Sequence, residues 1–385
     1  MLSNNRDTQK IQYLKIKKEK GQEFIKLINR EFKNDQIIDR KYKIFIENDF
    51  ILFPLIDNED KINRMKNIID KKTQFDVIQK KGLPNHKFKY RSIQEALKDK
   101  ISNDFINIIP RSYDIIGDIA IIEFNKFEPT YNKKTRFVKK EIAKAIMEVN
   151  KNVNSVFEKK GEISGKYRLR DLNLLYGDKN TETTYRENKC YFKLDVKNTF
   201  FSPRLVYERK RVASSNIKEN ETIIDLFAGV GPFSIQIAKN HNVEIYSFDL
   251  NPDAYHYLIK NIEFNNLRGK IHAYNLDVKT LLNPVSELGK KLKNSADRII
   301  MNLPEISLHF LDVTCYLMKK TGGIIHYYHF SEKPNPIQKA IEVLSINIAK
   351  KNWKIEKILK SKIVKTYSPK SDLIVLDLVI KSLMN

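Results

Sequence analysis

The alternation of strand-like and helix-like segments in the second half of the chain constrains its fold more than any other sequence feature. From Phe201 onward, short apolar runs are separated by longer segments with helical apolar spacing. The runs are ETIIDLFAG, VEIYSFD, KIHAYNLDV, ADRIIMNLP and GGIIHYYHF. This order predicts an α/β fold with a doubly wound, mostly parallel sheet, which binds ligands beyond the carboxyl ends of its strands. The final segment predicts two antiparallel strands joined at Tyr367-Ser368-Pro369.

Two further domains are predicted upstream. Residues 1–95 form a basic N-terminal domain, because their polar, lysine-rich texture ends where glycine, proline and asparagine punctuate the chain near residue 82. Residues 96–198 form a small α+β domain, in which a Gly117-Asp118 turn separates two strand-like runs and a helix pattern follows in VKKEIAKAIMEVN. Residues 199–385 then form a Rossmann-like domain.

Composition narrows the partners and the compartment. The chain has 70 Lys and Arg against 47 Asp and Glu, a formal net charge of +23 that favours a polyanionic partner, although genome bias also produces lysine-rich chains. No apolar run approaches the roughly 20 residues that span a bilayer, and no signal-peptide pattern is present. Cys190 and Cys315 suggest neither a disulfide nor a zinc site. We expect no metal and no membrane contact, and a cytoplasmic protein, with the nucleus or the mitochondrial matrix as alternatives.

The strongest local motif is IIDLFAGVGPF at residues 223–233, an apolar strand that ends in an acid and a glycine-containing turn before a helix. Asp225 and Phe227 precede the turn, and Gly229 and Gly231 allow the backbone to turn sharply and approach a ligand closely. The following helix presents free N–H groups, so a nucleotide-like ligand is expected. A dinucleotide is less favoured because the turn is not GxGxxG. An ordinary strand-turn-helix is the other explanation.

Two more acids follow successive predicted strands. Asp249, before Leu250, stands where a carboxylate can accept both ribose hydroxyls of an adenosine. Asp277, before Val278, stands where a carboxylate can accept a hydrogen bond from an adenine amino group. Each acid alone is more often a helix cap than a ligand. Three acids and a glycine turn at the ends of successive strands resemble the layout of Rossmann-like enzymes that use S-adenosyl-L-methionine.

The strand ADRIIMNLP ends in a candidate reaction site. Asn302 and Pro304 belong to an Asn-Leu-Pro segment that is related to the Asn-Pro-Pro-aromatic motif of amine-methylating enzymes, but Glu305 replaces the aromatic residue. Methylation of an exocyclic amine is therefore disfavoured. Methylation of cytosine C5 needs a cysteine nucleophile, and neither Cys190 nor Cys315 lies near a motif. Methylation of a ring nitrogen remains.

A guanine N1 target needs a base for its proton and a cation near O6, where negative charge develops. The segment FSPRLVYERKRV at residues 201–212 precedes the glycine turn and contains both kinds of group. A solvated, charged helix is the alternative interpretation of its ERKR run.

Several motifs together resemble one enzyme family. FSPRLVYERKRVA, DLFAGVGPF, DLNP, LDV and NLP, in this order, are similar to the archaeal and eukaryotic-type tRNA (guanine-37-N1)-methyltransferases. Upstream, YRSIQEAL, RSYDIIGDIAI, GKYRLRDLNLLYG and TETTYREN are also similar, so the resemblance runs from roughly residue 83 to the C-terminus. It implies a class I methyltransferase domain.

The resemblance also implies roles for individual residues. Glu208 is the candidate general base for the N1 proton, and Arg168 is the candidate that stabilises charge at O6, with Arg170 as its rival. Many relatives have tyrosine where this chain has Phe200, so only ring stacking is expected there. The target base is expected to contact Asn302 and Pro304. S-adenosyl-L-methionine is expected to contact Arg211, Asp225, Phe227, Gly229, Gly231, Asp249, Leu250, Asp277, Val278 and Asn302.

The expected reaction is methylation of guanosine 37 in the anticodon loop of tRNA, whose product also begins wybutosine synthesis. Loop bases can be splayed out and read on their edges, so the target is chemically reasonable. A monomer is expected, with the N-terminal domain contacting tRNA. Two alternatives stay open: methylation of another nucleobase or RNA, and a non-catalytic RNA-binding protein.

Overall fold

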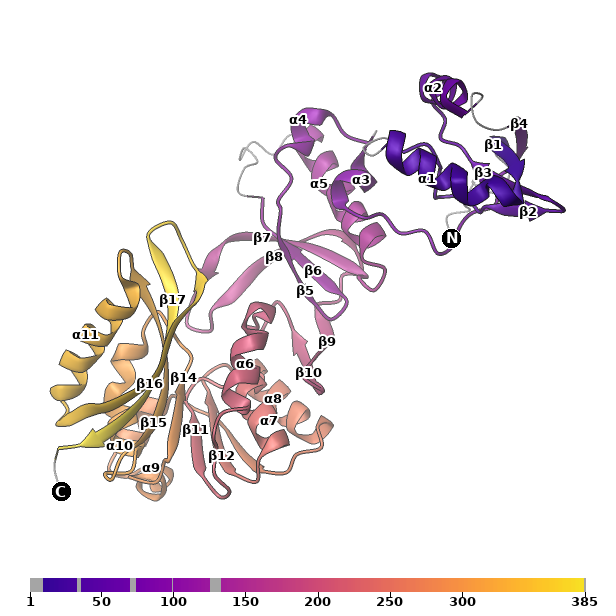
Figure 1. The fold of residues 1–385 in the computed structure, drawn as a ribbon. Helices are drawn as coiled ribbons and strands as arrows, with labels where there is room; N and C mark the ends of the chain where they lie inside the picture. Colours follow the sequence, from indigo (N-terminus) through magenta and orange to yellow (C-terminus); the bar gives the residue numbers. More distant parts are fainter. Residues whose placement is uncertain (1–9, 33–35, 70–73, 99, 125–132, 384–385) are drawn as a thin grey trace. The chain divides into compact units, whose positions relative to one another are not determined.

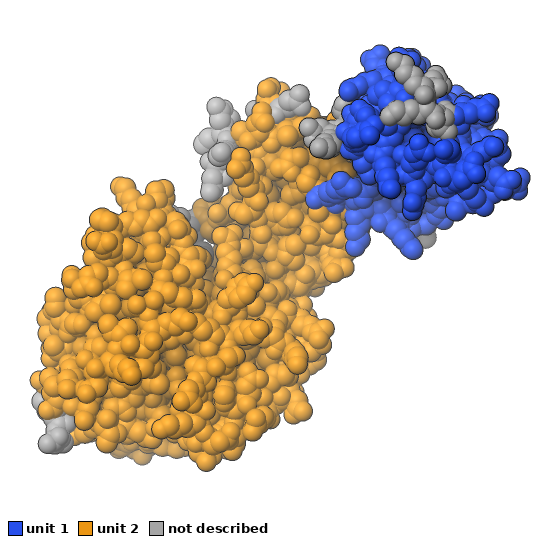
Figure 2. Space-filling model, viewed as in Figure 1, with its two compact units in different colours: residues 1–91 blue, residues 92–385 orange. Residues whose placement is uncertain are grey.

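The computed structural model describes residues 10–32, 36–69, 74–98, 100–124 and 133–383. The chain separates into two compact units, Met1–Arg91 and Ser92–Asn385, which are coloured separately in Figure 2. The first unit ends at Arg91, four residues before the boundary that the sequence predicts at residue 95. Within the described residues, no helix is long and apolar enough to cross a bilayer.

The first unit is a small sheet covered by two helices. Its four strands lie in the order β2-β3-β1-β4, and β1 pairs antiparallel with both β3 and β4. Leu14 on β1, Phe24 on α1 and Met65 on α2 belong to one buried apolar cluster, so both helices cover the sheet. The elements are β1 Lys10–Lys17, α1 Gly21–Glu31, β2 Phe45–Glu47, β3 Phe50–Pro54, α2 Glu59–Ile69 and β4 Asp76–Lys81.

The second unit begins with a mixed sheet, as the strand and helix patterns predict. β5 and β6 pair antiparallel around the expected turn, where Gly117 has φ +59°. A Cβ at Gly117 would lie 2.0 Å from Thr183 Oγ1, so this turn fits closely against the next segment. The elements are α3 Ile93–Leu97, α4 Asn103–Ile106, β5 Tyr113–Ile116, β6 Ile119–Ile122, α5 Lys133–Val149, β7 Ser155–Ser164, β8 Leu169–Gly177, β9 Glu182–Glu187 and β10 Cys190–Asp195.

The predicted α/β sheet has seven strands in the order β13-β12-β11-β14-β15-β17-β16. The first five are parallel, and the C-terminal hairpin adds β17 antiparallel to β15, as predicted (Figure 1). The order reverses between β11 and β14, which is where ligands bind in sheets of this type. The strands are β11 Thr222–Asp225, β12 Glu244–Asp249, β13 Lys270–Asn275, β14 Arg298–Met301, β15 Gly323–Glu332, β16 Trp353–Thr366 and β17 Ser371–Ser382.

Helices cover both faces of this sheet because its central strands are apolar on both sides. Ile223 packs in a cluster with α6 and α7, whereas its neighbour Ile224 packs in a second cluster with α10 and α11 on the other face. Figure 1 shows these two helical layers on either side of the strands. The helices are α6 Val206–Ala213, α7 Pro232–Asn240, α8 Pro252–Phe264, α9 Glu287–Leu292, α10 Leu311–Leu317 and α11 Pro336–Ala349.

Candidate active site

A cavity of about 460 Å³ lies at the carboxyl ends of β11, β12 and β14. Its first wall comes from the segments that follow β11, β12 and β13, together with Phe310. Its second wall comes from residues 302–306 after β14, the turn between β7 and β8, the segment before α6, and the C-terminal hairpin. The first wall carries Leu226, Phe227, Gly229, Asp249, Leu250, Asn251, Ala254, Leu276, Asp277, Val278, Lys279 and Phe310.

The glycine turn and Asp249 form one hydrogen-bonded unit in the first wall. The backbone N–H of Gly229 donates to Asp249 Oδ2 at 2.7 Å, and the N–H of Asn251 donates to Oδ1 at 2.9 Å. Burial raises the pKa of the Asp249 carboxyl, while these two hydrogen bonds oppose the rise. Asp249 is therefore fixed at the cavity surface as an acceptor for hydroxyl groups.

Asp277 caps a short helix and also lines the cavity. Its side chain accepts a hydrogen bond from the N–H of Lys279 at 3.0 Å and so caps the short helix at Val278–Leu282. It also lines the cavity together with Val278. Nearby, the rings of Phe227 and Phe310 meet edge to face at 4.8 Å, which makes this end of the cavity apolar.

Asp225 and Gly231 do not line the cavity but support its floor from behind. Asp225 is buried, and its Oδ2 accepts the Ser234 hydroxyl at 2.8 Å. Burial raises the pKa of this carboxyl to about 7. Gly231 has φ +87°, and a Cβ there would lie 2.5 Å from Leu258 Cδ1, so glycine is required where α7 begins.

Arg168 and Arg170 lie differently, although side chains two residues apart on one strand would point the same way. Arg168 precedes β8 with φ +57°, lines the cavity, and donates to Glu305 Oε1 at 2.9 Å. Arg170 is buried and donates to the carbonyl of Phe201 at 2.7 Å. Both guanidinium groups contact the Phe200 ring, at 5.2 and 5.6 Å from its centroid. Only Arg168 can reach a ligand in the cavity.

The second wall includes Asn302, Leu303 and Pro304, which follow β14 as expected. It also contains residues that the sequence did not single out. The hairpin adds Lys365 and Tyr367, whose ring lies 4.1 Å from that of Phe330. Burial and the nearby Arg204 lower the pKa of the Lys365 ammonium. The only sequence signal for this group was the Tyr367-Ser368-Pro369 turn, which predicted hairpin geometry and gave no reason to expect a ligand contact.

Glu208 and Arg211 are not among the cavity-lining residues. Glu208 is 2% exposed, accepts from Arg211 Nε at 2.9 Å, and forms an ion pair with Lys362. Arg211 also pairs with Asp377, and these bonds raise the Arg211 pKa although burial alone would lower it. The solvated-helix interpretation of this segment is therefore wrong, since Glu208 and Arg209 of α6 are both buried.

Two protein-family models match most of the Ser92–Asn385 unit. A model of the TRM5/TYW2 methyltransferase domain matches residues 183–356, and a model of the TYW2 N-terminal domain matches residues 93–181. A tRNA (guanine(37)-N(1))-methyltransferase Trm5b from Pyrococcus abyssi is 34% identical over 342 residues, covering 88% of this chain and 91% of the relative. The chain belongs to the TRM5/TYW2 methyltransferase family.

Solved structures of the TRM5/TYW2 family share the fold. The complex of aTrm5 and tRNALeu matches with a TM-score of 0.70 and 30% identity, over 95% of this chain and 99% of that one. Methanocaldococcus jannaschii TYW2 in complex with AdoMet matches with a TM-score of 0.52 and 28% identity, over 70% and 100%. The predicted Rossmann-like class I methyltransferase fold, preceded by further domains, is thereby confirmed. The two family matches meet near residue 182, upstream of the predicted boundary at residue 198.

The family includes a second chemistry. A tRNA(Phe) (4-demethylwyosine(37)-C(7)) aminocarboxypropyltransferase from Methanocaldococcus jannaschii is 35% identical over 260 residues, covering 67% of this chain and 93% of the relative. Family membership alone therefore does not decide which group is transferred.

A buried charged network links strands β14, β15 and β17 of the sheet to α6. His326 Nδ1 lies 2.7 Å from Asp377 Oδ1, and His326 Nε2 lies 2.9 Å from Arg298 Nη1. Because Arg298 can only donate, Nε2 must accept and Nδ1 must carry the proton. Burial lowers the pKa of His326, which agrees with a neutral ring. Asp377 is thus held between His326 and Arg211.

The two cysteines play no part in the cavity. Both are free and buried, and burial raises the pKa of Cys190 to about 11 and of Cys315 to about 12. A thiol of this kind is a poor nucleophile at neutral pH. Among the described residues, no cluster of three His, Cys, Asp or Glu could hold a metal ion.

Proposed function

We propose that this chain transfers the methyl group of S-adenosylmethionine to N1 of guanosine 37 in tRNA. The observation that carries the proposal is the extent of the match. Trm5b of Pyrococcus abyssi and the tRNA-bound aTrm5 match 88% and 95% of this chain, whereas two TYW2 structures match 70% and 75% and the aminocarboxypropyltransferase matches 67%. The proposed partner is therefore tRNA.

The first wall of the cavity suits S-adenosylmethionine. Asp249, fixed by two backbone N–H groups, can accept the ribose hydroxyls. Asp277 can accept from the adenine amino group, and Leu250, Val278 and Phe310 supply apolar contacts for the ring. The cofactor supplies an electrophilic methyl group on a positively charged sulfur. Asn302 would lie between the cofactor and the target base.

The second wall suits a guanine. Pro304 and the Phe200 ring can contact the flat faces of a base, and the Arg168 guanidinium can donate to O6 as negative charge develops there. As the N1–methyl bond forms and the sulfur–methyl bond breaks, the N1 proton must pass to a base. We assign Glu208 to this step. Glu208 does not line the cavity itself but follows Leu205, which does, by three residues. Because Glu208 forms an ion pair with Lys362 of β16, it must give up this ion pair to accept the substrate proton.

A matched pair of variants tests the assignment. Glu208→Gln should lower the single-turnover methylation rate by about 10²–10⁴-fold and leave tRNA affinity almost unchanged, because a general base contributes to the transition state alone. Glu305→Gln is the control, since it makes the same change in a carboxylate that lines the cavity and pairs with Arg168. A large loss in Glu305→Gln with none in Glu208→Gln would make Glu305 the base.

The product nucleoside tests the function itself. The protein is incubated with S-adenosylmethionine and an unmodified tRNA transcript that carries guanosine 37, and the nucleosides are identified by mass spectrometry. We expect 1-methylguanosine, and none when guanosine 37 is replaced. Another methylated nucleoside, or an aminocarboxypropyl adduct on tRNA carrying 4-demethylwyosine, would give the site a different reaction. Tight tRNA binding with no product would indicate a non-catalytic protein.

A further inference from the structure

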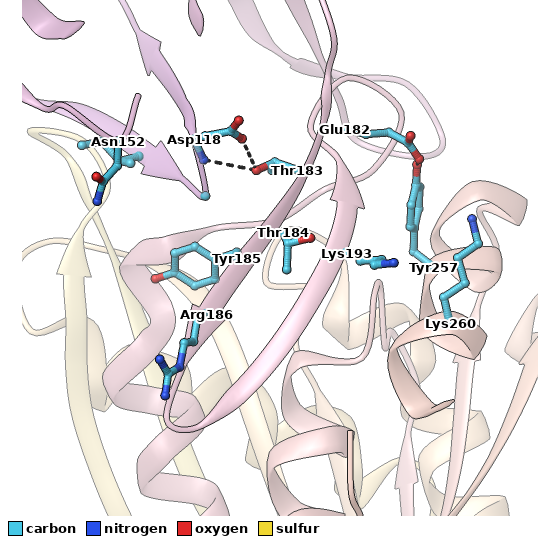
Figure 3. Close-up of a pocket in the computed structure, with 12 residues that line it drawn as sticks. Asp118, Asn152, Glu182, Thr183, Thr184, Tyr185, Arg186, Lys193, Tyr257 and Lys260 are labelled. Atoms are coloured by element: carbon cyan, nitrogen blue, oxygen red, sulfur yellow. Dashed lines mark hydrogen bonds between the residues drawn. The ribbon is translucent and has the colours of Figure 1, made fainter. Parts of the chain in front are cut away.

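A second depression of the Ser92–Asn385 unit lies outside the candidate active site. It has a volume of about 770 Å³ and is formed by the β5–β6 turn, the β9–β10 hairpin and α8. Figure 3 shows its side chains coming from these separate segments. Three exposed cations line it: Arg186 on β9, Lys193 on β10 and Lys260 on α8. We call this depression the basic cleft.

The basic cleft is held in shape by unusual contacts to the edge of β10. The side chain of Asn261 accepts from the N–H of Lys193 at 2.7 Å and donates to its carbonyl at 3.0 Å. Asn265, one helical turn later, makes the same two bonds to Tyr191, at 3.0 and 2.8 Å. Two amides, one within α8 and one at its C-terminal cap, thus replace a neighbouring strand and fix residues 191 and 193, whose side chains point to the same face.

The cations of the basic cleft form no ion pair within the part of the chain that the structure describes, whereas two of its acids accept hydrogen bonds from hydroxyl groups. Among the described residues, no carboxylate forms an ion pair with Arg186, Lys193 or Lys260. Asp118 accepts from Thr183 Oγ1 at 2.6 Å, and Glu182 accepts from the Tyr257 hydroxyl (Figure 3). Three positive charges are therefore available to an anionic ligand.

Aromatic rings alternate with these cations. Arg186 lies 5.2 Å from the Tyr191 ring, Lys193 lies 5.0 Å from the Phe264 ring, and the two rings meet at 5.7 Å. Tyr191 is 38% exposed and Phe264 is 50% exposed, although both are large apolar groups. Cations interleaved with exposed rings are typical of surfaces that bind a nucleic-acid strand through its phosphates and bases.

Helix α8 connects the basic cleft to the candidate active site. Asn251, which caps α8, and Ala254 line the cavity, while Tyr257 and Lys260 line the cleft. At 1.5 Å per residue, Ala254 and Lys260 are roughly 9 Å apart along the helix axis. A strand that delivers a base to the cavity can therefore reach the cleft within a few nucleotides.

We propose that the basic cleft binds the sugar-phosphate backbone of the tRNA substrate beside the target nucleotide. The inference rests on the proposed function for the identity of the RNA. Arg186, Lys193 and Lys260 contact phosphates, and Tyr191 with Phe264 offers stacking surface. None of these residues takes part in methyl transfer, so the cleft acts on tRNA affinity alone.

The test is a triple variant, Arg186→Gln, Lys193→Gln and Lys260→Gln, in the full chain. Its matched control is Lys320→Gln, Lys357→Gln and Lys381→Gln, which removes three exposed cations near Gly323, where β15 begins, opposite the carboxyl ends that carry the cavity. The dissociation constant of unmodified tRNA is measured against salt concentration. Affinity for S-adenosylmethionine and the methylation rate at saturating tRNA are measured alongside.

The cleft variant should bind tRNA about 10-fold more weakly at moderate salt, and the slope of log K against log salt should fall by about 2 to 3. Its affinity for S-adenosylmethionine, saturated rate and melting temperature should match those of the wild type. Equal tRNA affinity and slope in the cleft and control variants would overturn the proposal. The single variant Lys260→Glu, with a larger expected loss than Lys260→Gln, gives the same test if the triple variant folds poorly.

The outcomes separate the two proposals. If the wild type binds tRNA but forms no 1-methylguanosine, the proposed function fails while the salt comparison still decides the cleft. If 1-methylguanosine forms and the cleft variant loses no tRNA affinity, only the cleft proposal fails.

Discussion

At the scale of single residues, two acids at the ends of neighbouring strands have opposite surroundings. Asp249 ends β12 at the cavity surface and is held by backbone N–H groups that stabilise its charge. Asp225 ends β11 below the surface and accepts from the Ser234 hydroxyl. The sequence presents them as equivalent, but only Asp249 can contact a ligand while Asp225 stabilises the turn.

Replacing Asp249 by alanine should weaken S-adenosylmethionine binding by about 10-fold to 100-fold, because a charged acceptor contributes roughly 1.5–3 kcal/mol to its hydrogen bonds. Isothermal titration calorimetry measures the change. Asp277→Ala is the comparison, and its smaller expected loss reflects one proposed hydrogen bond in place of two. Unchanged affinity in Asp249→Ala would remove this residue from the cofactor site.

Asp225 should make folding stability depend on pH. Burial raises its pKa from 3.8 to about 7 in the folded state. Between these values the unfolded chain releases a proton that the folded chain keeps, so the stability contributed by this group falls as pH rises from about 4 to 7. The Asp225→Asn side chain cannot titrate. At pH 8 the free energy of unfolding of this variant should exceed that of the wild type by roughly a few kcal/mol, as expected for a pKa difference of about three units.

The measurement is urea unfolding of both proteins, without cofactor, at pH 5, 6, 7 and 8. The stability difference between Asp225→Asn and the wild type should grow with pH and level off above pH 7. A constant difference across this range would mean that Asp225 keeps an ordinary pKa.

At the scale of elements, α6 and α8 are polar helices whose polar side chains are partly buried in contacts with the β9–β10 hairpin. Helix α6 reads as a solvated charged helix, yet Arg209 is buried in a two-oxygen ion pair with Glu187 of β9. Helix α8 carries Asn261, which is buried and bonds to β10. Both helices therefore fix the β9–β10 hairpin, although neither has a sequence motif for that role.

The hydrogen bonds between Asn261 of α8 and the backbone of β10 should contribute to the stability of the fold. Asn261→Ala should destabilise the Ser92–Asn385 unit by about 1–3 kcal/mol, because it removes the partner of the Lys193 N–H and carbonyl and of the buried Val230 carbonyl. Thermal unfolding measures the loss. Asn347→Ala is the matched control, since among the described residues this half-buried amide bonds only to the Val343 carbonyl of its own helix. Equal melting temperatures for the two variants would contradict the role of Asn261.

At the scale of the whole molecule, the chain comprises two compact units, each with its own buried core. The cavity and the basic cleft both belong entirely to Ser92–Asn385. A unit with its own core can fold alone. The first unit is therefore expected to contribute to substrate affinity and not to the cofactor site.

A chain of residues 92–385 should fold and bind S-adenosylmethionine with the affinity of the full chain, while its affinity for tRNA falls. Calorimetry and filter binding measure the two affinities. Circular dichroism of the shortened chain is the control for folding. A folded 92–385 chain with weakened cofactor binding would show that the first unit supports the cavity.

The sequence by itself determined the α/β sheet, the glycine turn and the acids at its strand ends, because local apolar periodicity and glycine conformation are encoded within a few residues. It also placed Arg168, Asn302 and Pro304 at one site through family resemblance. Tertiary structure alone decided which side chains reach the cavity. Glu208 and Arg211 were drawn into buried ion pairs with Lys362 and Asp377, residues more than 150 positions away, and such pairing depends on packing that no local pattern records.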